Sequence, residues 1–303
     1  MKLGSHYRCV SGLDDDDLCF VCVRFPRSKG FKPTHSDSWI MRQDAEGLRP
    51  LYGYSGWATG LWYSGRALFA TYSRGKVIHF SAIGDDAKGD VWDLDELPAA
   101  LMGVWGLAEK NVFAWADRDL SSGIMFRWNG KKWAELPSPG FGVLDVHGVA
   151  KDLVLAVGRD GLAAHWNGKA WKRARVPTES NLNGVRVSSA DEIWAVGEDG
   201  SVLRGSTQRW ELVAEHATPL YSVARFAGET WVAAGEAGTG ALRDGKVEIV
   251  KPRVNALRFD VRGHLLASCP TKIVTTADAK AWTGYWSEGE ALGMLDSQEP
   301  LWT

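Results

Sequence analysis

The sequence lacks the features that mark secreted, disulfide-stabilised and membrane-spanning proteins. Only four cysteines occur in 303 residues, too few for a disulfide framework in a chain of this length. The N-terminus contains no apolar run of the roughly 7 to 15 residues that a signal peptide needs. No other stretch approaches the roughly 18 apolar residues of a membrane span. We therefore expect a cytoplasmic protein with reduced thiols and no membrane partner.

An excess of charge of one sign is also missing. The chain has 35 Lys and Arg residues against 37 Asp and Glu residues, and its formal net charge at pH 7 is −2. Nucleic acids and anionic membranes attract proteins that carry a large positive field, so neither is the expected partner of this chain. Any recognition that depends on charge must use a local group of residues.

Metal-binding motifs are absent as well. Cys19 and Cys22 form a CxxC on a predicted strand, where residues three apart point to opposite faces, and no second CxxC or histidine pair completes a zinc site. The run from Asp14 to Asp17 fails as an EF-hand loop, because Cys19 and Phe25 stand where that loop needs glycine and glutamate. We interpret the aspartates as a solvated turn between the first two strands.

Motifs for catalysis and nucleotide binding are missing too. The seven histidines are scattered without an HExxH, and the chain contains no GxSxG elbow, Walker loop or dinucleotide fingerprint. We therefore predict no catalytic residues, no metal and no cofactor, and a protein that is not an enzyme. The alternative is a hydrolase whose site is built from scattered loop residues.

What the sequence does contain is a repeat. The phrase RWNGKKW at 127–133 returns as HWNGKAW at 165–171, 38 residues later. Asn-Gly between aromatic segments predicts a type I′ hairpin, in which both central residues need a positive φ. The tryptophans on either side of each Asn-Gly then lie on the paired strands, where they can pack across the pair.

The repeat extends along most of the chain. Residues 182–213 divide into four short strands, and the spacing of the first two recurs at markers 10, 61, 104, 146, 185, 223 and 257. A period near 40 residues with four strands in each unit is typical of a β-propeller, whose blades bury their faces by stacking on one another. We predict an all-β fold in which residues 1–303 form a single propeller of seven four-stranded blades, with blade starts near 7, 59, 102, 144, 183, 221 and 255.

Two features of this repeat need separate interpretation. Residues 291–303 remain after the seventh unit, so they either close the ring or begin an eighth blade. Sixteen tryptophans make the chain tryptophan-rich, and several recur at the outer strand, which indicates wedges between blades rather than a ligand cage. The recurring outer tryptophans are Trp133, Trp171, Trp210 and Trp282.

The phrases DEIWAVGEDGSVLRG and LAVGRDGLAAHWNGKAW resemble bacterial propeller repeats of the BNR (Asp-box-like) and photosystem-assembly-factor type. The resemblance covers roughly residues 101–250 and implies a fold rather than an activity. The sialidase Asp-box pattern SxDxGxxW is not met, because Ser201 follows Asp199-Gly200 instead of preceding it. Sialidase catalysis is therefore not carried over to this chain.

Basic and aromatic residues gather in two segments near the N-terminus. The insertion RFPRSKGFKPTHS at 24–36 separates the second and third predicted strands, and LYGYSGWATG at 51–60 connects the first blade to the second. Both segments fall on the same predicted face, and Arg, Tyr and Trp are frequent in interface hot spots. The candidate partner-binding residues are Arg24, Arg27, Lys29, Lys32, Tyr52, Tyr54 and Trp57. Alternatively, Phe25 and Phe31 pin a long loop whose charges are merely solvated.

These observations together predict a non-enzymatic module that recognises another protein through one face. One role that fits a propeller without an export signal is an immunity-type inhibitor that neutralises a bacterial toxin or effector; an assembly scaffold is another. No obligate small molecule is expected. The alternative function is a glycan-binding or hydrolytic propeller that uses the central mouth of the ring.

Overall fold

The computed structural model describes residues 3–32, 36–83, 91–117, 122–286 and 297–300. Within these ranges the regular elements are β-strands and short 3₁₀ turns, without an α-helix. The chain divides into two compact units: Met1–Pro98 with Arg258–Thr303 forms unit 1, and Ala99–Leu257 forms unit 2.

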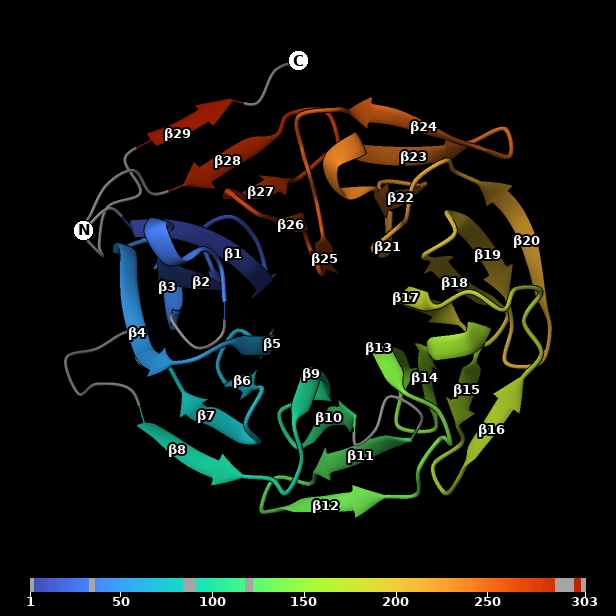
Figure 1. Ribbon diagram of the computed structural model, residues 1–303, viewed down its shortest axis with the longest axis horizontal. Helices are drawn as coiled ribbons and strands as arrows, with labels where there is room; N and C mark the ends of the chain where they lie inside the picture. Colours follow the sequence, from blue (N-terminus) through green and yellow to red (C-terminus); the bar gives the residue numbers. More distant parts are fainter. Residues whose placement is uncertain (1–2, 33–35, 84–90, 118–121, 287–296, 301–303) are drawn as a thin grey trace. The chain divides into compact units, whose positions relative to one another are not determined.

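Unit 1 contains three antiparallel sheets, which we number as blades 1, 2 and 7 (Figure 1). Blade 1 comprises β1 (Leu3–Gly12), β2 (Leu18–Pro26), the 3₁₀ turn η1 (Arg27–Lys29), β3 (Asp37–Asp44) and β4 (Gly47–Ser55). Blade 2 comprises β5 (Ala58–Tyr63), β6 (Leu68–Tyr72), β7 (Lys76–Ala82) and β8 (Val91–Glu96). Blade 7 comprises β25 (Arg258–Val261), β26 (Leu265–Cys269), β27 (Lys272–Thr276) and β28 (Thr283–Trp286), to which β29 (Ser297–Pro300) adds a fifth strand by pairing with β28.

Unit 2 contains four antiparallel sheets, blades 3 to 6. Blade 3 comprises β9 (Leu101–Ala108), β10 (Asn111–Asp117), β11 (Gly123–Trp128) and β12 (Trp133–Leu136). Blade 4 comprises β13 (Val143–Ala150), β14 (Leu153–Gly158), the 3₁₀ turn η3 (Arg159–Gly161), β15 (Ala163–Trp166) and β16 (Trp171–Ala174). Blade 5 comprises β17 (Leu182–Ser189), β18 (Glu192–Gly197), β19 (Ser201–Gly205) and β20 (Trp210–Glu215). Blade 6 comprises β21 (Ser222–Phe226), β22 (Glu229–Ala233), the 3₁₀ turn η4 (Gly235–Ala237), β23 (Thr239–Arg243) and β24 (Lys246–Lys251).

Every blade is a meander in which strands consecutive in sequence are hydrogen-bonded neighbours. The first strands of successive blades lie beside each other: β1 contacts β5 and β25 in unit 1, and β13 contacts β9 and β17 in unit 2. Seven such sheets make a seven-bladed β-propeller, so the predicted fold class is confirmed. The repeat markers fall on first strands, apart from Leu257, which immediately precedes β25. The single domain and the role of residues 291–303 in ring closure stay predictions.

The apolar core lies between neighbouring blades. The cluster between blades 1 and 2 contains Cys19, whereas the cluster that joins blade 7 to blade 1 contains Cys22. The two cysteines of the CxxC therefore point to opposite faces of β2, as the strand periodicity predicts. Burial raises the pKa of Cys22 to about 11, so this thiol stays protonated at neutral pH.

The Asn-Gly hairpins form where the sequence predicts them, but with a different turn. Each loop has four residues, and Asn129 Oδ1 accepts hydrogen bonds from the backbone N–H groups of Lys131 (2.9 Å) and Lys132 (3.0 Å). Gly130 has a φ of 92°, whereas Asn129 is not among the non-glycine residues with positive φ. The predicted type I′ turn is therefore wrong, because the asparagine side chain closes the loop as an Asx turn. Asn167 makes the same two contacts in the second hairpin.

Paired tryptophans flank these loops. Trp128 pairs in register with Trp133, and their ring centroids lie 5.8 Å apart; Trp166 and Trp171 repeat the arrangement at 5.4 Å. Trp171 packs against the core cluster between blades 3 and 4, as the wedge interpretation predicts. Cross-strand aromatic contacts of this kind fix the register of the outer hairpin.

Side chains of one blade cap backbone groups on the first strand of the next blade. Asp145 Oδ2 accepts from the backbone N–H of Val185 (2.9 Å), and His147 Nδ1 accepts from that of Val187 (3.1 Å). An N–H group at the edge of a sheet needs such a partner when a neighbouring blade covers it. Blades 4 and 5 are thus joined by polar contacts as well as by apolar packing.

One hydroxyl joins all three blades of unit 1. Ser11 Oγ on β1 accepts from the backbone N–H of Tyr63 on β5 (3.0 Å) and donates to Asp260 Oδ2 on β25 (2.9 Å). Ser11 is buried, at 2% exposed. The first and last blades of the chain therefore meet through a side-chain contact, while blade 1 and blade 7 are each built from consecutive strands.

Candidate functional site

The predicted insertion begins later than the sequence suggests. Strand β2 continues to Pro26, and Arg24 pairs in register with Asp37 of β3. Arg24 is therefore a buried strand residue, 6% exposed, rather than part of a loop. The strand extends past the apolar run because pairing with β3 continues through a charged residue. The loop proper starts with η1 at Arg27.

An aromatic stack holds this loop against the body of unit 1. The ring of Phe31 lies between His6 of β1, at a centroid distance of 4.3 Å, and Trp57, at 4.6 Å, and both pairs are stacked. Phe25 adds a tilted contact with Phe31 at 5.2 Å. Phe31 thus pins the loop, as one of the two interpretations of the insertion predicts.

The pinned loop presents positive charge to solvent. Arg27, Lys29 and Lys32 are all exposed, and we call these three residues the loop cations. Among the described residues neither Lys29 nor Lys32 forms an ion pair. The backbone carbonyl of Lys32 accepts from Ser36 Oγ (2.6 Å), which ties down the far side of the loop. Pinning and exposure coexist, so the two interpretations of the insertion do not exclude each other.

The second predicted segment is mostly strand. Tyr52 and Tyr54 lie on β4, which continues to Ser55, and both are half-buried against the core between blades 1 and 2. Tyr54 makes a tilted contact with Tyr72 of β6 at 4.6 Å. The expectation that these tyrosines belong to a connecting loop is wrong, because β4 stays paired with β3 to its end. Trp57 remains in the short link between the blades.

Residues that the sequence interpretation did not single out lie around Trp57. Arg8 of β1 lies over the ring of Trp57, with Cζ 4.8 Å from the ring centroid. Arg258, at the start of β25, lies close enough to lower the pKa of Arg8, an effect secondary to that of burial. Burial, with a smaller contribution from Arg8, lowers the pKa of His6 to about 4, so His6 is neutral at pH 7. No local motif connects these residues, since Arg258 lies far from His6 and Arg8 in sequence.

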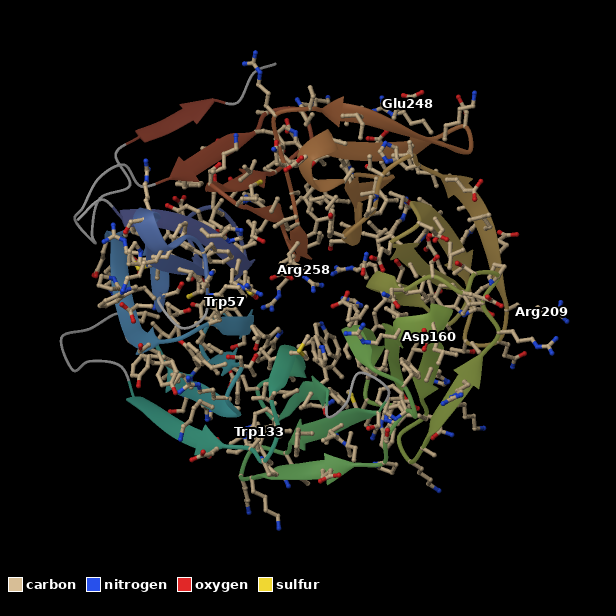
Figure 2. The ribbon with its side chains drawn as sticks, in the orientation of Figure 1. Trp57, Trp133, Asp160, Arg209, Glu248 and Arg258 are labelled. Carbon is tan, nitrogen blue, oxygen red and sulfur yellow. The ribbon has the colours of Figure 1, made fainter. Side chains whose placement is uncertain are left out.

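Figure 2 shows where the labelled members of this group lie. Trp57 lies beside the first strands of blades 1 and 2, and Arg258 lies at the start of β25. We define the recognition surface as the loop cations together with Phe31 and Trp57. It is formed entirely by unit 1.

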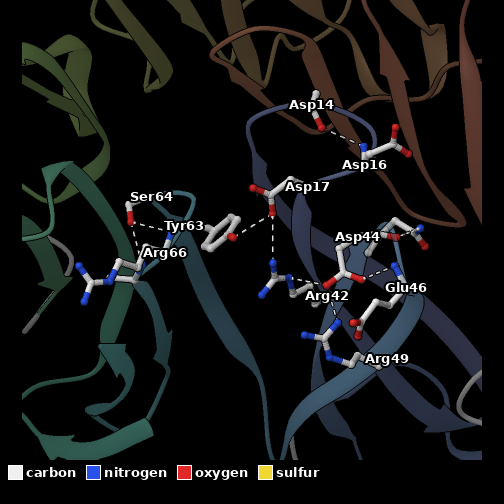
Figure 3. Close-up of polar contacts among 12 residues, drawn as sticks. Asp14, Asp16, Asp17, Arg42, Asp44, Glu46, Arg49, Tyr63, Ser64 and Arg66 are labelled. Carbon is white, nitrogen blue, oxygen red and sulfur yellow. Dashed lines mark hydrogen bonds and ion pairs between the residues drawn. The ribbon is translucent and has the colours of Figure 1, made fainter. Parts of the chain in front are cut away.

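The aspartate turn between β1 and β2 is only partly solvated. Tyr63 donates its hydroxyl to Asp17 Oδ1 (2.8 Å), and Arg42 Nη2 lies 3.8 Å from the same oxygen (Figure 3). Burial raises the pKa of Asp17 despite these contacts. Asp15 Oδ1 lies 3.1 Å from His264 Nδ1 of blade 7. Asp17 therefore joins blades 1 and 2, and Asp15 lies against blade 7, which corrects the interpretation of a wholly solvated turn.

The described part of the chain contains no group of three or more His, Cys, Asp or Glu side chains that are placed to hold a metal ion. It also contains no helix with the length and hydropathy that a membrane span requires.

Comparison with known proteins supports the fold and points to a bacterial relative. No family model matches the sequence. The immune protein Tsi7 of Pseudomonas aeruginosa (strain PAO1) is 26% identical over 150 residues, which is 48% of this chain and 46% of Tsi7. The chain thus matches about half the length of that curated relative.

Several solved structures resemble this fold. The WD40 propeller domain of Doa1 superposes with a TM-score of 0.67 at 11% identity, covering 89% of this chain and 92% of that chain. YCF48 bound to D1 peptide gives 0.62 at 14% identity, covering 95% of each chain. Saccharomyces cerevisiae Sqt1 gives 0.63 at 9% identity, covering 92% of this chain and 84% of that chain. At such identities the likeness shows the fold alone.

Proposed function

We propose that this chain is a non-enzymatic module that binds another protein through the recognition surface. The observation that carries the proposal is the loop itself: three exposed cations stand on a segment that Phe31 fixes between His6 and Trp57. A loop already held in one conformation loses less entropy when a partner binds, which favours affinity. Exposed arginine and lysine beside a half-buried tryptophan also match the composition of interface hot spots and their rims.

The partner in this proposal is a bacterial toxin or effector, which the chain neutralises as an immunity-type inhibitor. Support for this narrower role comes from the partial likeness to Tsi7, an immune protein, at 26% identity. An inhibitor of this kind needs no chemistry of its own, because blocking the partner's surface is sufficient. The role also agrees with the cytoplasmic location expected from the sequence.

The proposal is tested by capturing the partner with tagged protein from a lysate of the source cells and identifying it by mass spectrometry. The test variant reverses the three loop cations: Arg27→Glu, Lys29→Glu and Lys32→Glu. The control variant, Lys131→Glu with Lys132→Glu, reverses two exposed lysines on the blade 3 hairpin. We expect the wild type and the control to retain a stoichiometric partner and the test variant to lose it, with an unchanged Tm. Equal capture by all three proteins would contradict the proposal.

A second role uses the same surface. YCF48 has been solved with a bound D1 peptide, so a propeller with this fold is known to accept a peptide. If the captured partner is a subunit of a larger complex rather than a toxin, the chain is an assembly scaffold. A retained glycan with no protein partner would instead favour the glycan-binding alternative.

A further inference from the structure

Lysines gather at one end of blades 3 and 4. In a meander of four antiparallel strands, the hairpin between the first two strands and the hairpin between the last two lie at the same end of the sheet. Strand β9 of blade 3 contacts β13 of blade 4 (Figure 1), and the fifth residues of these strands, Trp105 and His147, are in ring contact at 5.3 Å. The corresponding ends of the two blades are therefore neighbours. The four hairpins contain five exposed lysines, which we call the hairpin lysines: Lys110, Lys131, Lys132, Lys151 and Lys169.

The two hairpins of each blade are held together by a hydrogen bond. In blade 3, Arg127 Nε on β11 donates to Asn111 Oδ1 at the start of β10 (2.6 Å). In blade 4, His165 Nε2 on β15 lies 2.8 Å from the backbone oxygen of Asp152, in the turn before β14. Arg127 and His165 occupy equivalent positions of the sequence repeat. The backbone that carries the lysines is therefore fixed by the fold, whereas the lysine side chains reach into solvent.

The hairpin lysines carry positive charge that the protein does not neutralise. None of them forms an ion pair with another residue that the structure describes. The four hairpins also contain two acidic residues, Glu109 and Asp152, so the lysines outnumber them. A lysine ammonium group is a compact point charge on a flexible stem, which adapts to anions that are themselves mobile. This end of blades 3 and 4 therefore attracts a surface that bears many negative charges.

The residues around the lysines favour a lipid bilayer over a nucleic acid. Single-stranded nucleic acids bind by stacking their bases on aromatic side chains, and base pairs of a duplex are read most often by arginine. In these hairpins Trp128 packs on Trp133 and Trp166 on Trp171, and the basic residues of the turns are all lysines. Val149, next to last in β13, is an apolar side chain that is 43% exposed. Proteins that lie on a bilayer combine apolar burial at the headgroups with attraction to anionic lipids.

We propose that the hairpin lysines form a docking surface for an anionic lipid bilayer. Clusters of roughly four to eight basic residues bind anionic headgroups, and each residue contributes when it lies within a Debye length of the surface. The inference goes beyond the proposed function and does not rest on it, because the recognition surface belongs to unit 1 and the hairpin lysines belong to unit 2. A net charge of −2 predicts no membrane partner, but net charge does not reveal lysines that two blades bring together.

The test measures cosedimentation of the full chain with two kinds of vesicle: phosphatidylcholine alone, and equal parts of phosphatidylcholine and phosphatidylglycerol. We expect binding to the anionic vesicles only, with an affinity that falls as salt rises. Lys131→Gln with Lys132→Gln should weaken this binding about 30-fold, since each lysine near the surface contributes about fivefold. The control Lys29→Gln with Lys32→Gln removes the same charge from the loop cations and should bind as the wild type does.

A second pair of substitutions tests whether the surface spans both blades. Lys151→Gln with Lys169→Gln, on blade 4, should weaken binding to anionic vesicles by a similar factor. Both pairs should leave the Tm unchanged, because the four side chains are exposed and form no ion pair with the described residues. Wild-type affinity in both pairs, or equal binding to phosphatidylcholine alone, would overturn the proposal. Binding of a labelled DNA duplex that depends on the hairpin lysines, under conditions where anionic vesicles do not bind, would overturn it in favour of a nucleic acid.

Discussion

Gly200 provides a sharp test of the blade packing, because a matched glycine exists elsewhere in the same unit. Gly200, in the loop between β18 and β19, has a φ of 84°, and Gly228, between β21 and β22, has a φ of 81°. A Cβ on Gly200 would lie 1.9 Å from the backbone oxygen of His216, whereas a Cβ on Gly228 would have no atom within 4 Å. The two substitutions to alanine therefore share the conformational strain and differ in the overlap.

The magnitudes follow from this difference. An L-residue in the left-handed region costs about 1–2 kcal/mol, and this applies equally to Gly200→Ala and Gly228→Ala. The gain from a less flexible unfolded chain is also equal in both, so it cancels. The overlap with His216 forces a backbone shift at a residue whose N–H donates to the Gly200 carbonyl (2.9 Å). We expect this shift to add about 1–3 kcal/mol, the range for overpacking or for a lost hydrogen bond.

Thermal unfolding followed by circular dichroism measures the difference. At about 2 °C per kcal/mol for a chain of this size, Gly200→Ala should lower the Tm by about 2–6 °C more than Gly228→Ala does. The wild type and Gly228→Ala serve as the references. Equal losses of Tm in the two variants would refute the reasoning, since they would show that the backbone near Gly200 shifts without a cost in free energy.

Two further predictions concern unit 1. Ser11→Ala leaves the backbone N–H of Tyr63 without its acceptor, so we expect the free energy of unfolding, measured with urea, to fall by about 1–3 kcal/mol. The control Ser206→Ala, in an exposed turn, should cause a smaller loss. Equal losses in the two variants would contradict the role of Ser11 in connecting the blades. Burial lowers the pKa of His6 from 6.5 in the unfolded chain to about 4 in the folded protein. Between pH 4 and pH 6.5 the unfolded chain therefore binds more protons than the folded protein. The free energy of unfolding consequently falls as the pH is lowered from 6.5 to 4. His6→Phe should retain the stack with Phe31 and flatten the dependence of Tm on pH over this window; an unchanged slope would rule out His6 as its source.

The blades could be predicted from the sequence because a four-strand pattern recurs in it with a period near 40 residues. Val146 and Val185 mark first strands that are equivalent in successive blades, and the structure places both there. Turn geometry was less accessible, since Asn-Gly alone does not reveal that Asn129 closes a four-residue loop with its side chain. Local competition between side-chain and backbone hydrogen bonds decides such turns.

The candidate surface was predicted in part. The charge and aromatic content of the insertion pointed to Arg27 and Phe31, both of which lie on the loop that the structure describes. Arg24 was misplaced because pairing with β3 extends the strand beyond its apolar run. Arg8 and Arg258 escaped notice because no local pattern connects residues that only the meeting of the first and last blades brings together.

The side-chain hydrogen bonds that connect neighbouring blades have a consequence for how such a chain can change in length. Asp145 reaches Val185, and His147 reaches Val187, each across 40 residues, which is close to the repeat period itself. A duplicated blade would carry two groups. One is the side chain that accepts a hydrogen bond from the first strand of the next blade, and the other is the backbone N–H that donates to a side chain of the previous blade. The corresponding contact from Ser11 to Tyr63 spans 52 residues, so the insertion in blade 1 lengthened the chain without disturbing the joint. Loops can therefore differ in length and sequence from blade to blade, while the hydrogen bonds that connect neighbouring blades are retained when a blade is duplicated.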